Sequence, residues 1–123
     1  MKVVFVAGPF SGVNAWEIEQ NVRRAEALAL EIWQRGGVAI CPHSMNRFFF
    51  GTASEEVYRE GCLEIIRRVD GVALVDGWER SSGTAGEVSE ANVNGIPIFG
   101  PDQRELLFAW LRSDSEAIDQ DRG

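Results

Sequence analysis

The residues best suited to chemistry lie in the stretch GWERSSGTAGE at positions 77–87, between an apolar run and an apparent helix. It gathers three glycines, three small hydroxyl residues and two carboxylates. A carboxylate in such a loop could attack the anomeric carbon of a glycoside and form a covalent ester. Ser81, Ser82 and Gly83 stand just before the helix, where its amides and its dipole favour an anion. The stretch therefore indicates Glu87 as a candidate nucleophile beside a candidate phosphate site.

Glu87 also has a purely structural interpretation. The residues Thr84–Glu87 fit a capping box, with Thr84 at the helix cap and Glu87 reaching back to its amide. A capping box leaves the three glycines of the loop unexplained, although they allow close backbone approach. Glu79 is the competing carboxylate, but Trp78 and Arg80 flank it on an expected exposed tip. Trp78 is expected among the substrate contacts, and both interpretations of Glu87 stay open here.

A second candidate loop, AGPFSG, follows the first apolar run of the chain. It matches neither the G-x-G-x-x-G dinucleotide fingerprint nor the phosphate loop that ends in G-K-[ST]. Its glycines have a structural interpretation as turn residues, whereas its serine and backbone amides could contact a phosphate or a sugar hydroxyl. The expected substrate contacts in this loop are Gly8, Pro9, Phe10, Ser11 and Gly12.

His43 and an aromatic run follow the second apolar run. A lone histidine is more often structural than catalytic, and we expect His43 to contact the ligand rather than to act as the catalyst. Phe48, Phe49 and Phe50 have three interpretations: core packing, a wall against a flat base, or a contact between two copies of the chain.

The elements that would position these loops alternate between strands and helices. Apolar runs predict strands at Val3–Ala7, Val38–Cys41, Gly71–Val75 and Ile96–Phe99. Four helices are predicted: Ala15–Arg35, with Asn14 and Glu17 as a capping box, a second helix after Thr52, a third at Ala85–Asn94, and a last one from Asp102 to about Leu111. The second helix is expected to turn Val57, Cys62, Ile65, Ile66 and Val69 toward the core, and the last helix Leu106, Leu107 and Trp110. The segment PHSMNRFFFGT is expected to be a loop.

This order predicts an α/β fold with a parallel sheet of four to five strands and helices on both faces. In such sheets ligands bind beyond the carboxyl ends of the strands, where all three unusual loops would meet. Residues 1–112 are expected to form a single domain, and residues 113–123 a polar, acidic and frayed tail.

Composition restricts the classes of function. The net charge of -7 and the absence of a basic patch in the sequence argue against nucleic acid as a partner. One histidine and two distant cysteines, Cys41 and Cys62, argue against a metal site and a disulfide framework, and no cofactor is expected. No apolar stretch approaches ~20 residues, so we expect no membrane partner and a cytoplasmic location.

The strand followed by AGP, the PH after the second strand, and the strand followed by GWE-x-S-x-G-x-x-x-E resemble the nucleoside 2-deoxyribosyltransferase superfamily over roughly residues 1–100. The resemblance implies a flavodoxin-like or Rossmann-like three-layer sandwich, usually dimeric or larger. It also implies cleavage of the N-glycosidic bond of 2'-deoxynucleosides or their 5'-monophosphates, with Glu87 as the nucleophile that attacks C1'. Ser81 matches a serine that helps bind the phosphate in the monophosphate hydrolases.

Two residues depart from that family pattern. Phe5 stands where a tyrosine commonly positions the nucleophile, and Cys62 stands where an aspartate commonly handles the leaving base. Neither replacement makes the same hydrogen bonds. One alternative is therefore a nucleotide-binding or sensing domain without catalysis. A second, weaker resemblance of SSGTAGE to the P-G-G-x-G-T-x-x-E loop implies a phosphoribohydrolase of the cytokinin-activating type.

Overall fold

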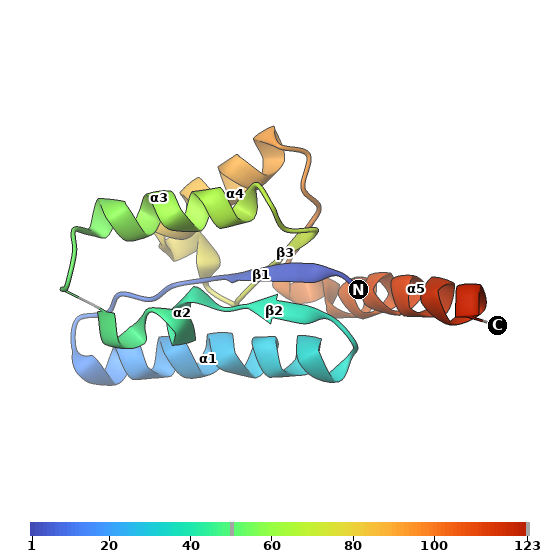
Figure 1. Cartoon of the computed structure of the whole chain (residues 1–123). Helices are drawn as coiled ribbons and strands as arrows, with labels where there is room; N and C mark the ends of the chain where they lie inside the picture. Colours follow the sequence, from blue (N-terminus) through green and yellow to red (C-terminus); the bar gives the residue numbers. More distant parts are fainter. Residues whose placement is uncertain (50, 123) are drawn as a thin grey trace.

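The computed structural model describes residues 1–49 and 51–122, and these residues form a four-stranded, all-parallel sheet in the order β2-β1-β3-β4 (Figure 1). The elements are β1 (Val3–Ala7), α1 (Ala15–Gln34), β2 (Val38–Ile40), α2 (Pro42–Met45), η1 (Arg47–Phe49), α3 (Glu55–Ile66), β3 (Gly71–Leu74), η2 (Trp78–Arg80), α4 (Ser82–Val93), β4 (Ile98–Phe99), η3 (Pro101–Gln103) and α5 (Arg104–Arg122). The predicted flavodoxin-like, Rossmann-like α/β fold is confirmed.

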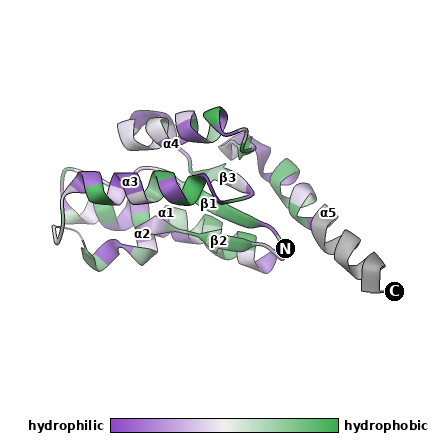
Figure 2. Cartoon of the chain, turned by 45° about the horizontal axis from the view of Figure 1, so that its top comes forward, coloured by the Kyte–Doolittle hydropathy of each residue, from purple (hydrophilic) through white to green (hydrophobic). Residues whose placement is uncertain are grey.

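The core has two halves, one on each face of the sheet. Side chains alternate along β1, so Val4 and Val6 pack against α1 and α5, whereas Phe5 and Ala7 pack on the α3 and α4 side. Figure 1 shows α3 and α4 above the sheet and α1 below it. Figure 2 colours β1 and β2 as hydrophobic, as expected for strands covered on both faces.

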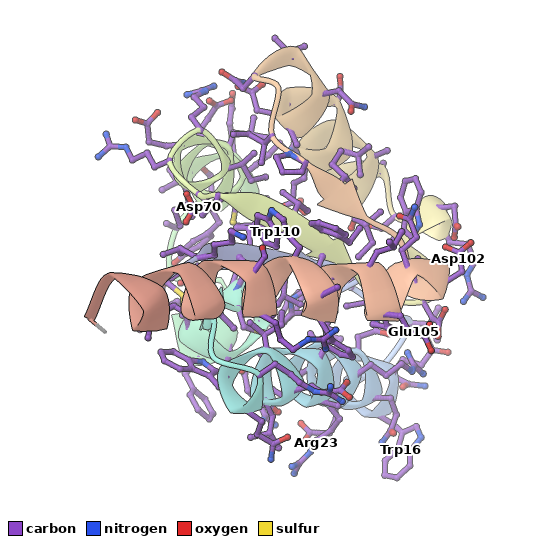
Figure 3. All side chains as sticks on the ribbon, turned by 90° about the vertical axis from the view of Figure 1, so that its right-hand side faces the viewer. Trp16, Arg23, Asp70, Asp102, Glu105 and Trp110 are labelled. Atoms are coloured by element: carbon purple, nitrogen blue, oxygen red, sulfur yellow. The ribbon has the colours of Figure 1, made fainter. Side chains whose placement is uncertain are left out.

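The C-terminal helix closes the lower half of the core. Trp110 turns from α5 toward the sheet (Figure 3), and its ring lies 5.0 Å from that of Phe99 between centroids. The ammonium group of Lys2 lies 4.5 Å above the same ring. The backbone of α5 is helical as far as Arg122, and fraying of the acidic tail stays a prediction.

Several predicted boundaries were wrong. The segment that begins at Pro42 is not all loop, because Pro42–Met45 forms the short helix α2 and Arg47–Phe49 forms η1. Proline is favoured in the first turn of a helix, where its missing N–H costs nothing. The cap of α3 is Ser54, whose side chain accepts from the Val57 amide, and not Thr52. The edge strand β4 is only Ile98–Phe99.

Two residues predicted to face the core are exposed. Val57 lies about 140° around α3 from Cys62 at 100° per residue, so the two cannot share a face. Leu106 is turned about 100° away from Leu107, which is fully buried. Ile66 and Val69, by contrast, are buried as predicted. Among the described residues, no helix is long and apolar enough to cross a bilayer.

Candidate active site

A cavity of about 920 Å³ opens where β1, β2 and β3 end. The loop after β1, the helix α2 after β2, and η2 with the start of α4 after β3 all contribute to its walls, as the parallel topology requires. Of the residues predicted to form a site, those that line the cavity are Gly8, Pro9, Phe10, Ser11, His43, Ser81, Ser82, Gly83 and Glu87.

Two predicted contacts do not line this cavity. Trp78 is partly buried against the core cluster of the α3 and α4 side, so η2 turns its ring inward. Gly12 lies beside Glu17, whose carboxylate accepts a hydrogen bond from the Val13 amide at 2.9 Å. Asn14 caps α1 as predicted, because its side chain accepts from the Glu17 amide at 2.9 Å. The predicted cap at Asn14 is thus confirmed, whereas the Glu17 carboxylate accepts from the Val13 amide and not from the Asn14 amide that a capping box would use.

Glu87 is not the capping residue of α4. The cap is Ser81, whose hydroxyl accepts from the Thr84 amide at 3.2 Å, so the helix begins three residues earlier than the Thr84 capping box would place it. Glu87 therefore sits in the second turn and lines the cavity. Its carboxylate has no hydrogen-bond or ion-pair partner within the described part of the chain. Burial raises the pKa of Glu87 from 4.5 to about 7.

The first turn of α4 offers several hydrogen-bond donors to a ligand. In residues 1–49 and 51–122, the amides of Ser82 and Gly83 have no partner, as is normal for the first turn of a helix. The hydroxyl of Thr84 is also without a partner there, and the residue is only 1% exposed. A buried hydroxyl without a partner is costly, so a ligand or water that bonds it is expected in this cavity.

The loop after β1 is held by two side chains. His43 Nε2 lies 3.1 and 2.9 Å from the first two carbonyl oxygens of Gly8–Ser11, and Asn21 Nδ2 lies 3.1 Å from each of the last two. Gly8 is required here because a Cβ at this position would lie 2.6 Å from Cβ of Val75 at the end of β3. This wall of the cavity is therefore fixed by hydrogen bonds and close packing.

The same contacts define the state of His43. Both partners of Nε2 are carbonyl oxygens, so Nε2 carries the proton and Nδ1 is left as an acceptor. Nδ1 is buried and has no partner among the described residues. Burial lowers the pKa of His43 below its usual 6.5, so the imidazole is neutral at neutral pH. His43 positions the loop and has no proton to give to a substrate.

Phe5 and Cys62 form part of the cavity wall on the side of α3 and α4. Phe5 is fully buried, and its ring offers no hydrogen bond. Burial, and to a lesser extent the charge of Glu87, raises the pKa of Cys62 to about 11. The thiol therefore keeps its proton at neutral pH. Cys62 and Cys41 are both free.

Sequence reasoning missed the contribution of α1. Trp16, Gln20 and Arg24 line the cavity, and their spacing of four residues places them on one stripe of the helix. Because α1 begins directly after the loop of β1, its first turns must lie at the same edge of the sheet. The short connection between this loop and α1 was the feature of the sequence that could have predicted the contribution of α1. Trp16 is 73% exposed and projects outward from α1 at the rim of the cavity (Figure 3).

Arginines are the second feature that was missed. Arg24 lines the cavity from α1 and Arg59 from α3, and the sequence alone gave no reason to pair them with this edge. Arg80 was expected on an exposed tip; it is exposed, and it also lines the cavity. Its guanidinium lies over Gly77, which has φ of 82° and no Cβ to block it. Three arginines thus line the cavity.

Within the described ranges, no three His, Cys, Asp or Glu side chains cluster as a metal ion would require. The chain belongs to a family described only as a domain of unknown function (DUF4406), whose model matches residues 2–100. The match includes every residue that lines the cavity. No curated protein matches the chain.

Proposed function

We propose that this protein is an N-glycosidase or 2-deoxyribosyltransferase that cleaves the N-glycosidic bond of 2'-deoxynucleosides or their 5'-monophosphates through Glu87. The observation that carries the proposal is the Glu87 carboxylate, which is half-buried in a strand-end cavity, has a pKa raised to about 7 and has no protein partner among the described residues. Acidic side chains with strongly shifted pKa values in cavities are concentrated at functional sites, whereas a carboxylate with only a structural role would be paired with a cation or a hydrogen-bond donor.

The proposed reaction has two steps. Glu87 attacks C1', the bond from C1' to the base nitrogen breaks, and a deoxyribosyl ester forms on the carboxylate. Water or a second base then takes the sugar and regenerates Glu87. The cavity of about 920 Å³ is at the upper end of the usual range for small-molecule sites, which leaves room for a nucleotide and an acceptor.

The start of α4 supports a phosphate at one end of the substrate. The amides of Ser82 and Gly83, the hydroxyl of Thr84 and the positive end of the helix dipole all favour an anion there. The Ser81 hydroxyl accepts a hydrogen bond from the Thr84 amide and can still donate its own proton to a phosphate oxygen. Arg80 at the rim adds positive charge, so we expect monophosphates to bind more tightly than free nucleosides.

A direct test is incubation of the purified protein with a panel of deoxynucleosides and their 5'-monophosphates, followed by chromatography for free base. Mass spectrometry of the quenched protein should show a deoxyribosyl or deoxyribosyl phosphate adduct on the peptide that contains Glu87. Absence of free base and of adduct with every substrate would contradict the proposal. The same panel tests the cytokinin-type phosphoribohydrolase when ribonucleoside monophosphates are added.

A nucleotide-binding or sensing domain is the second candidate. It is favoured by Phe5 and Cys62, because both cavity positions lack the groups that would position a nucleophile or protonate a base. Calorimetry separates the two candidates. Tight nucleotide binding without turnover would support sensing, whereas turnover would support the enzyme.

We further propose a homodimer whose contact includes η1. Phe48 is 85% exposed, Phe49 and Met45 are also exposed, and the third phenylalanine of the run, Phe50, lies outside the described residues. Adjacent exposed aromatics are typical of protein contacts. Light scattering at micromolar concentration should give twice the chain mass, and Phe48→Glu should shift the protein toward monomer. A monomeric parent would overturn the proposal.

A further inference from the structure

The proposed reaction raises the question of where the leaving base obtains a proton. When an N-glycosidic bond breaks, its electron pair passes to the base nitrogen. A neutral base must gain a proton to leave as a stable molecule, and a positioned acid typically contributes 10²–10⁴-fold to such a step. A base that is already positively charged leaves as a neutral molecule and needs no acid.

The side chains in the lining that would ordinarily be considered as a proton donor to the base, His43, Tyr58 and Cys62, are poorly suited to that role. Nε2 of His43 donates to backbone carbonyls, and Tyr58 donates its hydroxyl proton to the carbonyl of Phe49 at 3.0 Å. The thiol of Cys62 binds its proton too tightly to serve as an acid near neutral pH. Glu87 cannot donate a proton while it acts as the nucleophile.

The lining of the cavity favours a positively charged ring. Phe10, Trp16 and Tyr58 place three aromatic side chains around it, and aromatic faces attract cations, most strongly when both are desolvated. Four carboxylates line the cavity against three guanidinium groups: Glu17, Glu55, Asp76 and Glu87 against Arg24, Arg59 and Arg80. The start of α4 suits the phosphate, and the carboxylates and aromatic rings in the rest of the lining suit a cationic base.

We propose that this site acts on N-glycosides whose base carries a fixed positive charge in its ring, such as a pyridinium or an N7-alkylated purine. The inference rests on the proposed function. Glu87 bonds to C1' as the bond to the base nitrogen breaks, and the departing electron pair neutralises the ring cation. Water then adds to C1', its proton passes to solvent, and the Glu87 carboxylate is regenerated.

A cationic base also activates the nucleophile. With its pKa raised to about 7, Glu87 is only partly ionised near neutral pH. A positive ring within a few ångströms favours the ionised carboxylate and lowers that pKa. A cationic substrate thereby generates the form of Glu87 that attacks it, whereas a neutral base leaves part of the protein in the unreactive protonated form.

The test compares 7-methyl-2'-deoxyguanosine 5'-monophosphate with 2'-deoxyguanosine 5'-monophosphate, each corrected for base release in the presence of Glu87→Gln. The 2'-deoxy form of nicotinamide mononucleotide is the pyridinium arm, so that all three substrates carry the same sugar, and the faster cationic substrate identifies the ring system. We expect kcat/KM for a cationic substrate to exceed that of the neutral one by at least ~10²-fold, the lower bound for a missing acid. A smaller ratio would overturn this inference but leave the proposed function standing. No corrected release from any substrate would overturn both.

A pair of variants tests the reason for the preference. Cys62→Asp places a carboxyl where the charge of Glu87 already acts, so its pKa should rise and the group should hold a proton to give to the base. Cys62→Asn has the same size and cannot supply a proton. The ratio of cationic to neutral rates should fall at least about tenfold with Cys62→Asp and change less than about threefold with Cys62→Asn. Equal changes in both variants would contradict the proton argument.

Discussion

The two walls of the cavity are built in opposite ways. On the wall that follows β1, every carbonyl of Gly8–Ser11 accepts from His43 or Asn21. On the wall that follows β3, within the described residues, the first amides of α4, the Thr84 hydroxyl and the Glu87 carboxylate have no protein partner. Native proteins seldom leave buried polar groups unpaired without a reason. Nδ1 of His43 and Oγ1 of Thr84 are both buried without a partner among the described residues, so the contrast lies in the rest of each wall: the backbone of the first is held by side chains, whereas the second presents its first amides and a carboxylate to a ligand.

Burial acts on both walls with opposite consequences for charge. It lowers the pKa of His43 and raises that of Glu87, because it disfavours the charged form of each. His43 is thereby fixed as a neutral residue that holds the loop. Glu87 is brought to a pKa where it changes charge near neutral pH, which is the property expected of a reactive carboxylate.

The largest expected effect is on catalysis. Glu87→Gln should lower base release at least ~10³-fold, because removal of a covalent nucleophile eliminates the main route. Glu79→Gln is the matched control, since Glu79 is exposed in η2 and does not line the cavity. If Glu87→Gln released base at the rate of the parent, Glu87 would not be the nucleophile.

The same substitution should change how stability depends on pH. The pKa of Glu87 is raised on folding, so its stabilising contribution is present below about 4.5 and is lost as the pH rises through about 7. A difference from 4.5 to about 7 corresponds to at most about 3.4 kcal/mol, and solvent screening of the half-buried side chain makes the contribution smaller. Glu87→Gln should therefore match the parent at pH 4 and unfold at higher denaturant concentration at pH 8. An unchanged difference between the two pH values would contradict the buried carboxylate.

Substitutions in the wall that follows β1 should change the stability of the protein. His43→Phe keeps the ring volume and removes the hydrogen bonds to Gly8 and Pro9, and it should cost about 1–2 kcal/mol in the free energy of unfolding. Because the pKa of His43 is lowered on folding, its own contribution to stability is lost as the pH falls below 6.5, so the difference in stability between the parent and His43→Phe should be smaller at pH 5.5 than at pH 8. Chemical denaturation at pH 5.5 and 8 checks both effects.

The smallest expected effect is at the cap of α4. Ser81→Ala should cost about 1 kcal/mol, because the Thr84 amide loses its acceptor. It should also reduce the preference for a deoxynucleoside monophosphate over the free nucleoside, measured by calorimetry. Ser89→Ala, an exposed position in the same helix, is the matched control. A loss of stability with no change in that preference would make Ser81 a cap only.

The sequence by itself determined the order of strands and helices, the parallel sheet and the edge where the loops meet. Continuous apolar runs such as Val3–Ala7 and helical spacing in α1 are local patterns, and connection rules convert them into a topology. Glu87 and the hydroxyls before it could be found for the same reason, since they follow a strand directly. Their chemical roles stay predictions.

Only the tertiary structure decided which groups are paired at that edge. Whether Thr84 or Ser81 caps α4 depends on the backbone of one residue, and both are helix-capping types. The partners of His43 lie 34 and 35 residues away along the chain, and Arg24, Arg59 and Arg80 reach the cavity from three separate elements. Burial, and with it the pKa of Glu87, arises from packing between distant segments, so no local pattern in the sequence can encode it.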